Sequence, residues 1–377
     1  MKLPSMAVLL LFVLFSFSSA SHISTDTSSS RQRTNDEVNN MYSSWLAKHG
    51  KIYSSLEEKE RRFQIFKDNL MYIEQHNSGN HSYKLGLNQF ADLSVEEYRL
   101  LYNRPRNIDS KRKLKNVMST RDHNSVRSGD VLPDSIDWRT KGALVPIKDQ
   151  GHCGCCWAFA TIGSVEAINQ IVTGDLIRLS EQHLVDCDRS HNKGCSGGRR
   201  DSAFEFIMGN GGIDLDKNYP YTGKDGTCTN YTRKNVKVVS IDGYVDVSVN
   251  NESALQKAVV NQPVTVAIDA SSGDFRFYDS GIFDGSCGRD LDHDVLLVGY
   301  GTKDGTDYWI VRNSWGEDWG DQGYIRMERN TNEKEGKCGI AMKPSYPLKT
   351  GLSPPKMANI LVPFLFLFFL QFALSLA

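Results

Sequence analysis

Three cysteines within four positions give the stretch DQGHCGCCWAFA, residues 149–160, a dense group of reactive side chains. They are Cys153, Cys155 and Cys156. Such a group can bind a metal ion, exchange disulfides, form structural disulfides or supply a thiolate nucleophile. The residues that follow favour an amphipathic helix with Cys156 in its first turn, where the positive end of the helix dipole stabilises a thiolate.

A zinc site and a redox module are the alternatives to a nucleophile. His293 can in principle complete a zinc site, but the cysteine spacing lacks the paired C-x-x-C arrangement of zinc ligands. A zinc site would also leave Gln150 and Asn313 without a role. A redox module is disfavoured because no βαβ pattern surrounds the cysteines.

Several motifs, in a fixed order, resemble those of the papain and cathepsin family of cysteine proteases. QGHCGCCW resembles the nucleophile motif of the family, and His293 lies 137 residues after Cys156, within the separation of about 130–150 that the family shows. RNSWG supplies Asn313, where the family keeps its third catalytic residue. GCSGG, PVTVAI, DYWIVRNSWG and CGIAM also occur in the order of the family, and the resemblance covers Leu132 to about Pro347.

The preceding segment resembles the inhibitory propeptide of the same family. NDEVNNMYSSWLAKHG and LEEKERRFQIFKDNLMYIEQHN each place apolar residues on one helical stripe, which predicts two packed helices. Two propeptide motifs of the family are matched, the first by Glu58, Arg62, Phe66, Asn69, Ile73 and Asn77, the second by Gly86, Asn88, Phe90 and Asp92. We expect this propeptide to cover the cleft, and acid to weaken its docking through Asp92.

The main region changes its secondary-structure signals half-way. Helical patterns dominate from Trp157 to about Gly212, whereas the residues after Asn235 are rich in β-branched and aromatic side chains. This order predicts the α+β fold class. The resemblance implies a papain-like two-lobed fold, in which a helical lobe from about Leu132 to Gly243 faces a β-barrel-like lobe across an active-site cleft.

The resemblance also implies a thiol-dependent endopeptidase that works through an acyl-enzyme. Its nucleophile is Cys156, its general acid is His293, and Asn313 holds the imidazole in plane. Gln150 and the backbone N–H of Cys156 stabilise the oxyanion, a role typically worth ~3 kcal/mol per donor. Trp315 shields the hydrogen bond between the histidine and the asparagine from water. No metal or organic cofactor is implied.

Substrate-binding positions follow from the same resemblance. Backbone groups around Gly197 and Gly198 bind the substrate strand. The pocket for the side chain two residues before the cleaved bond is lined by Arg199, Arg200, Ala267, Leu291 and Lys343. Three of these five residues are basic, so we expect the pocket to tolerate or prefer an acidic or polar group, with Asp292 as a neutralising neighbour. Alternatively, the long side chains point outward and leave the pocket apolar.

The sequence contains eight cysteines, and a nucleophile among them must stay reduced. The resemblance implies three disulfides, each worth about 4 kcal/mol in the chain-entropy model: Cys153 with Cys195, Cys187 with Cys228, and Cys287 with Cys338. Cys155 is then unpaired and departs from the family motif, which has Ser or Ala there. We expect an inert thiol, with oxidation against Cys156 as the alternative. Asp294 is a second departure, and its strand position points it away from His293.

These two departures leave an alternative function open. A catalytically impaired homologue would keep the fold and act as a peptide-binding or inhibitory protein. A thiol alkylator discriminates the two, because a competent enzyme reacts faster at Cys156 than at Cys155.

The ends of the chain resemble targeting segments. We expect a signal peptide at 1–20, a propeptide at 21–130 with a basic linker at 104–130, a peptidase domain at 131–349, and a hydrophobic tail at 350–377. The tail has the form of a membrane anchor or of a cleaved lipid-anchor signal. Three N-glycosylation acceptors occur, at Asn80, Asn230 and Asn251. These features predict the secretory pathway, with a vacuole, a lysosome or the extracellular space as the destination.

The charge balance excludes one class of partner. The chain has 44 basic and 45 acidic residues, so its net charge does not favour binding to nucleic acid. The expected partners are protein or peptide substrates, the chain's own propeptide and cystatin-like inhibitors, and the expected state is a monomer.

Overall fold

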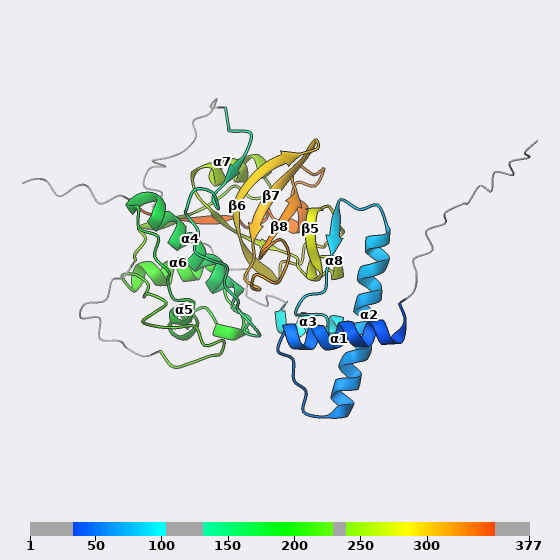
Figure 1. Ribbon diagram of the computed structural model, residues 1–377. Coiled ribbons are helices and arrows are strands. Elements are labelled where there is room, and N and C mark those ends of the chain that lie inside the picture. The colour runs from blue at the N-terminus through cyan, green and yellow to red at the C-terminus, as the bar shows by residue number, and fades with distance from the viewer. Residues whose placement is uncertain (1–32, 103–130, 229–238, 351–377) are drawn as a thin grey trace, which may run out of the picture.

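The computed structural model describes residues 33–102, 131–228 and 239–350 (Figure 1). The expected signal peptide, the basic linker, the tail from residue 351 onward and the acceptor Asn230 lie outside these residues. Within the described part of the chain, no helix is both long enough and apolar enough to cross a membrane.

Two long helices begin the described chain and confirm the helices expected from the apolar stripes. They are α1 (Asn35–Lys48) and α2 (Leu56–Ser78). Thr34 caps α1 by accepting the N–H of Glu37, whose carboxylate in turn accepts the N–H of Thr34. The two helices cross in Figure 1, and Tyr42 of α1 packs against Phe66 of α2 with ring centroids 5.1 Å apart. The apolar stripes therefore face each other.

Two short elements follow and join this helical pair to the main body. They are β1 (Tyr83–Leu85) and α3 (Val95–Tyr102). β1 pairs antiparallel with β5 of the main sheet, with Tyr83 opposite Gly281. The sequence patterns predict neither element.

A helical lobe contains the expected helix after the cysteine cluster. Its elements are α4 (Cys156–Thr173), α5 (Glu181–Cys187), the 3₁₀ turn η1 (Gly194–Ser196) and α6 (Arg200–Gly209). α4 ends at Gly174, whose φ of +79° reverses the chain as helix-terminating glycines do. The lobe has its own core around Trp157, Leu184 and Phe204.

The second lobe is built on a mostly antiparallel sheet in the order β1-β5-β8-β7-β6-β4-β9-β3, with β2 paired to β6. The strands are β2 (Ile136–Asp137), β3 (Gly243–Asp246), β4 (Val264–Ile268), β5 (Tyr278–Phe283), β6 (His293–Lys303), β7 (Thr306–Arg312), β8 (Tyr324–Glu328) and β9 (Ser345–Leu348). Three short helical elements accompany them: α7 (Glu252–Asn261), α8 (Gly273–Arg276) and η2 (Lys337–Gly339). This arrangement confirms the predicted α+β class.

The expected boundaries of the helical lobe are wrong at the N-terminal side. Ile136 and Asp137 pair with Tyr300 and Gly299 of β6, so this segment belongs to the β lobe. Trp138 packs there with Leu296, Val298 and Ile310 in a small core on the sheet. The reason is burial: Trp138 and its neighbours cover apolar side chains of β6 and β7, next to Ile171 of α4.

The interface between the lobes is formed by α4 and β6. A small cavity there is lined from the helix by Phe159, Ala160 and Gly163, and from the strand by the consecutive residues 294–296. Gly163 allows this approach, because a Cβ at that position would lie 3.1 Å from a methyl carbon of Leu296. Since α4 begins one turn before Ala160 and β6 begins at His293, the first residues of both elements lie at the same end of the interface.

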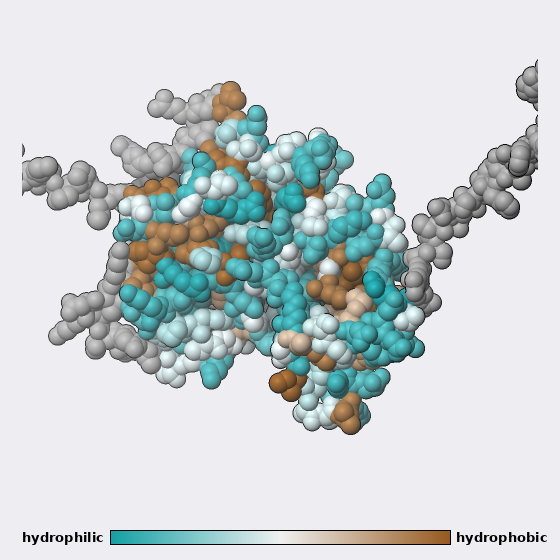
Figure 2. Space-filling view, in the orientation of Figure 1, coloured by the Kyte–Doolittle hydropathy of each residue, from teal (hydrophilic) through white to brown (hydrophobic). Residues whose placement is uncertain are grey.

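Hydrophilic residues cover much of the face drawn in Figure 2, including much of the region that α1 and α2 occupy in Figure 1. Hydrophobic surface gathers over the region that α4 and α6 occupy in Figure 1.

Candidate active site

Cys156 is the first residue of α4 and is buried, with 7% of its surface exposed. No side chain caps this helix, and its first turn has no acidic residue. The N–H groups of the first turn and the helix dipole therefore act on the thiol without a competing carboxylate in that turn, which favours the thiolate.

His293 is the first residue of β6 and is fully buried. Its Nε2 lies 2.7 Å from Oδ1 of Asn313, which directly follows β7. An amide oxygen only accepts, so Nε2 is the donor and carries the proton. The N–H of Ser314 donates to the same Oδ1 at 2.8 Å, which fixes the orientation of the amide.

Trp315 covers this hydrogen bond. Its ring stacks on the imidazole of His293, with centroids 4.6 Å apart and planes 25° apart, and it has no exposed surface. Trp319 packs edge-on against it at 5.2 Å. The two aromatic rings bury the imidazole of His293 beside Asn313, an arrangement that suits the predicted shielding of their hydrogen bond from water.

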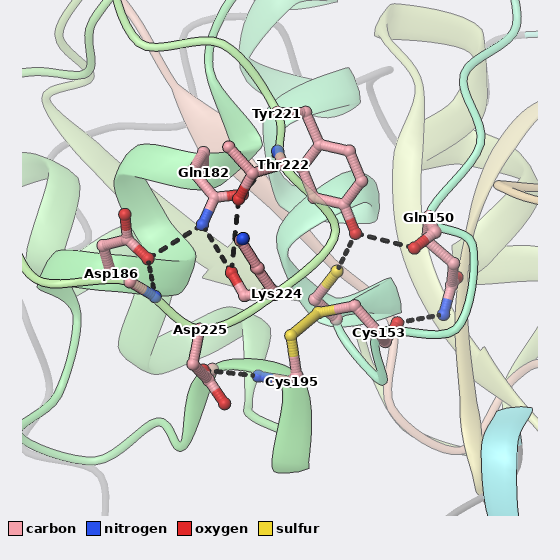
Figure 3. The surroundings of a disulfide bond; sticks show 12 residues. Gln150, Cys153, Gln182, Asp186, Cys195, Tyr221, Thr222, Lys224 and Asp225 are labelled. Atoms are coloured by element: carbon pink, nitrogen blue, oxygen red, sulfur yellow. Dashed lines mark hydrogen bonds between the residues drawn. A yellow bond between two sulfur atoms is a disulfide. The ribbon is translucent and has the colours of Figure 1, made fainter.

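Gln150 is fully buried and firmly held. Its Nε2 donates to the carbonyl of Cys153 at 2.9 Å, and its Oε1 accepts from the hydroxyl of Ser314 at 2.7 Å. Its backbone carbonyl accepts from the hydroxyl of Tyr221 at 2.7 Å (Figure 3). An amide nitrogen has two N–H groups, so the second remains to donate to an oxyanion.

Three disulfides join the pairs expected from the resemblance: Cys153–Cys195, Cys187–Cys228 and Cys287–Cys338. The first, drawn in Figure 3, ties the turn before α4 to η1. Gly198, after η1, lies directly on the ring of Trp157, since a Cβ there would be only 2.5 Å from it. The disulfide and this contact hold the Gly197–Gly198 segment beside Cys156.

Cys153 is unavailable as a metal ligand because it is bonded to Cys195. Across the described ranges, no group of three or more His, Cys, Asp or Glu residues is arranged to hold a metal ion.

Cys155 is fully buried, and its sulfur lies 3.0 Å from the hydroxyl oxygen of Tyr221. Burial raises the pKa of the Cys155 thiol well above its usual range, so the thiol stays neutral. This environment favours the inert thiol over the oxidised pair.

The two arginines of the expected pocket are paired with carboxylates. Arg199 binds Asp201, and the buried Arg200 binds Asp294 and the backbone carbonyl of Lys343. Asp292 accepts the N–H of Ala270, so it is Asp294 that lies against the guanidinium. The positions of the remaining members are as follows: Ala267 is buried opposite Asp294 in the sheet register, Leu291 is half-buried, and Lys343 is exposed.

The expected propeptide lies against Trp315, the aromatic cover of the site. Gln89 donates to the carbonyl of Trp315 at 2.6 Å, and Phe90 packs edge-on against the ring of Trp315 with centroids 5.1 Å apart. The hydroxyl of Tyr98 donates to the carbonyl of Ala270 at 2.9 Å. Sequence reasoning identified Phe90 but missed the other two propeptide residues, because nothing local marks their distant partners.

The expected role of Asp92 in docking is wrong. Its buried carboxylate accepts from Lys51 at 3.0 Å and from the hydroxyl of Tyr53 at 2.8 Å, and both belong to the propeptide itself. Carboxylates that join the two parts are Asp274 of α8, which accepts from the hydroxyls of Tyr72 and Tyr83, and Asp318, which pairs with Lys48. The Asp92 carboxylate thus binds side chains of the propeptide itself.

Two family patterns match this chain. The pattern described as "Papain family cysteine protease" matches residues 132–348, and the "Cathepsin propeptide inhibitor domain (I29)" matches residues 42–98. The chain belongs to the papain family of cysteine proteases. It is made as a proenzyme whose propeptide is an inhibitor domain, which confirms the resemblance, the fold and the protease activity predicted from the sequence.

Relatives of known sequence and structure agree with this membership of the papain family. Cysteine proteinase RD21A of Arabidopsis thaliana is 57% identical over 361 residues, which cover 93% of this chain and 77% of that protein. Germination-specific cysteine protease 1 of the same plant is 51% identical over 363 residues, covering 93% and 96%. The proform of the ragweed pollen allergen Amb a 11 cysteine protease has a TM-score of 0.76 and 37% identity, covering 85% of this chain and 97% of that one. A recombinant stem bromelain precursor has a TM-score of 0.74 and 41% identity, covering 83% and 99%.

Proposed function

We propose that the mature domain is an endopeptidase in which Cys156 is the nucleophile, His293 the general acid and base, and Asn313 the residue that orients the imidazole. The main support is the 2.7 Å hydrogen bond from His293 to Asn313 under Trp315, at the same end of the α4–β6 interface as Cys156. Because Nε2 is engaged by Asn313, Nδ1 is the ring nitrogen that exchanges protons during the reaction.

The reaction follows from these positions. The thiolate of Cys156 attacks the carbonyl carbon of the peptide bond, and the resulting oxyanion accepts from Gln150 Nε2 and from the N–H of Cys156. The C–N bond then breaks as Nδ1 of His293 gives its proton to the leaving amine. Water attacks the remaining thioester while Nδ1 takes its proton, and the acid product leaves with the thiolate restored.

Three variants test these roles on peptide hydrolysis. Cys156→Ala removes the nucleophile and abolishes hydrolysis, His293→Ala lowers kcat/KM by about 10²–10⁴-fold, and Gln150→Ala lowers kcat by about 10²–10³-fold. The matched control is Asp304→Asn, in an exposed turn between β6 and β7. A folded Cys156→Ala protein that still hydrolyses peptides would exclude the proposed nucleophile.

The substrate strand is proposed to bind along Gly197 and Gly198, with one side chain directed to the pocket of Arg199, Arg200, Ala267, Leu291 and Lys343. The support is the position of Gly198 on the ring of Trp157, which directly follows Cys156.

Maturation is proposed to remove residues 1–20 as a signal peptide and the propeptide by cleavage in the linker 104–130, leaving a domain of about 131–349. The apolar tail from residue 350 is either an anchor or a cleaved signal. Intact mass of the mature protein after thiol labelling measures both termini and the number of free thiols in one experiment. Labelling of one thiol, at Cys156, is the expected result.

The secretory pathway is the route proposed for a papain-family proenzyme of this kind, with a vacuole, a lysosome or the extracellular space as its destination. Asn80 and Asn251 are exposed, as glycan acceptors must be. Asn251 caps α7 with its side-chain oxygen, which accepts the N–H of Ala254 and leaves the amide nitrogen for a glycan. We also propose that the mature enzyme is a monomer and that cystatin-like inhibitors bind it.

A further inference from the structure

The hydroxyl of Tyr221 contacts two residues of the turn that carries the proposed oxyanion donors. It donates to the backbone carbonyl of Gln150 at 2.7 Å (Figure 3), and its oxygen lies 3.0 Å from the sulfur of Cys155. Gln150 supplies one oxyanion donor with its side chain, and Cys155 directly precedes Cys156, whose N–H is the other. One hydroxyl group therefore binds both ends of this turn.

The direction of both hydrogen bonds follows from the number of protons. A hydroxyl has a single proton, and Tyr221 gives it to the carbonyl of Gln150, so the S–H of Cys155 donates to the oxygen of Tyr221. Burial raises the pKa of both the Tyr221 hydroxyl and the Cys155 thiol, so each group keeps its proton. Cys155, Tyr221 and Gln150 thus form a chain of hydrogen bonds in which each bond strengthens the next.

Tyr221 is held in place by two helices of the helical lobe. Its ring packs edge-on against Phe159 of α4, with ring centroids 5.0 Å apart. The next residue, Thr222, donates its N–H to the side chain of Gln182 of α5 at 2.9 Å (Figure 3). The position of the Tyr221 hydroxyl is therefore set from outside the turn that it contacts.

This hydroxyl completes the set of groups that hold Gln150. The side chain of Gln150 is bound to Cys153 and Ser314, and its backbone N–H donates to the carbonyl of Ser314 at 2.9 Å. Without Tyr221, the carbonyl of Gln150 would keep only the longer bond from the N–H of Cys153, at 3.4 Å. An oxyanion donor is effective when it is held in position before the oxyanion forms, so this loss should weaken the donor.

We propose that Tyr221 is a positioning residue of the peptidase, which holds Gln150 so that its side-chain amide reaches the oxyanion. The inference rests on the proposed endopeptidase function. The oxyanion forms twice, when Cys156 attacks the peptide bond and when water attacks the thioester, so the donor acts in whichever step limits the rate. Loss of the hydroxyl therefore lowers kcat and leaves KM unchanged.

The variant Tyr221→Phe removes the hydroxyl and keeps the ring. In the processed enzyme we expect kcat for peptide hydrolysis to fall about 5–20-fold, with KM within about twofold of wild type. In the Gln150→Ala background the same change should lower kcat by less than about twofold, because the amide that Tyr221 positions is absent.

Alkylation of Cys156 by iodoacetamide separates this role from a merely structural one. The thiolate attacks the methylene carbon and displaces iodide, and no oxyanion forms. We therefore expect Tyr221→Phe to alkylate within about twofold of the wild-type rate while its hydrolysis falls.

The matched control is Tyr219→Phe. Tyr219 lies two residues away in the same segment, and its hydroxyl donates to Asp186 of α5 at 2.8 Å. Removal of this hydroxyl should keep kcat within about twofold of wild type, because the bond does not involve Gln150.

Three results would overturn the inference. One is a folded Tyr221→Phe enzyme with the wild-type kcat. Another is an equal loss of hydrolysis and alkylation in Tyr221→Phe, since the hydroxyl would then act on the nucleophile or on folding. The third is a full loss of kcat on adding Tyr221→Phe to Gln150→Ala, since Tyr221 would then act through another group.

Failure of the proposed function gives a different result. A processed wild-type protein that hydrolyses no peptide contradicts the endopeptidase activity, and the inference with it. An active wild-type enzyme with an unaffected Tyr221→Phe variant contradicts the role of Tyr221 alone.

Discussion

At the scale of single residues, Cys155 and Cys156 are neighbours in different environments. Cys155 is fully buried against the hydroxyl of Tyr221, and burial raises its pKa, so its thiol is a poor nucleophile. Cys156 begins α4, where the helix dipole favours the charged form. The environment, and not the order in the sequence, therefore separates a structural thiol from a reactive one.

We predict that Cys155→Ser leaves kcat/KM within about threefold of wild type, because the exchanged atom keeps a hydrogen-bonding partner in Tyr221 and does not take part in the reaction. The measurement is peptide hydrolysis together with alkylation at pH 6, where one thiol per molecule should react in both proteins. Equal labelling of two thiols in the wild type, or an inactive Cys155→Ser enzyme, would contradict the assignment.

At the scale of elements, the propeptide is held by strand pairing and by two tyrosines. β1 pairs with β5, and the hydroxyls of Tyr72 and Tyr83 both donate to Asp274 of α8. Hydrogen bonds to a charged group typically contribute about 1.5–3 kcal/mol each. The two tyrosines thus add polar attraction to the strand pairing at this contact.

We predict that the double variant Tyr72→Phe and Tyr83→Phe speeds processing of the precursor by about 10–100-fold, because the propeptide dissociates more readily. Both changes lie in the propeptide, so the mature enzyme is identical to wild type and serves as its own control. The measurement is the disappearance of the precursor band over time. Asp274→Ala removes the acceptor of both hydrogen bonds and should speed processing by a similar factor. An unchanged processing rate in both the double variant and Asp274→Ala would contradict this role of the two tyrosines.

Elements with strong local signals could be predicted from the sequence, and elements that depend on distant partners could not. α1 and α2 have capping residues and apolar stripes, so both were found. β2 is two residues long and pairs with a strand more than 160 residues away, so it was assigned to the wrong lobe. The pair of Arg200 and Asp294 was missed for the same reason, whereas the motif residues of the site were found because the resemblance supplied their roles.

At the scale of the whole molecule, Asp188 of the peptidase domain and His49 of the propeptide contribute to stability with opposite dependence on pH. Burial raises the pKa of Asp188 in the peptidase domain to about 7, so this domain loses stability as pH rises from about 4 to 7. In the propeptide, burial and Lys48 lower the pKa of His49, so the propeptide loses stability as pH falls below 6.5. Hydrogen bonds from Arg61 and Arg62 lower the pKa of Glu58 to about 2. The stability that ionised Glu58 gives the propeptide is therefore lost only as pH falls below 4.5.

We predict that His49→Gln reduces the acceleration of processing between pH 7 and pH 5 by at least twofold. His49 packs on Trp45 and lies near Lys48, Lys51, Asp92 and the Asp318 of the peptidase domain, so its protonation in acid disturbs the junction of the two parts. The measurement is the ratio of processing rates at the two pH values.

The control for this measurement is His81→Gln, at an exposed position of the propeptide. It should keep the wild-type ratio. If His49→Gln also kept the wild-type ratio of processing rates, the prediction would be contradicted, because groups other than His49 would then cause the faster processing in acid.

Processing also changes the border of the sheet. β5 lies between β1 and β8, so removal of the propeptide turns β5 into an edge strand with unpaired backbone N–H and C=O groups. Exposed carboxylates flank it, at Asp279 within the strand and Asp284 just after it. Negative charges at such a border discourage pairing between copies of the mature enzyme, so the groups that lie beside the docked propeptide also protect the active protein from aggregation after the propeptide has gone.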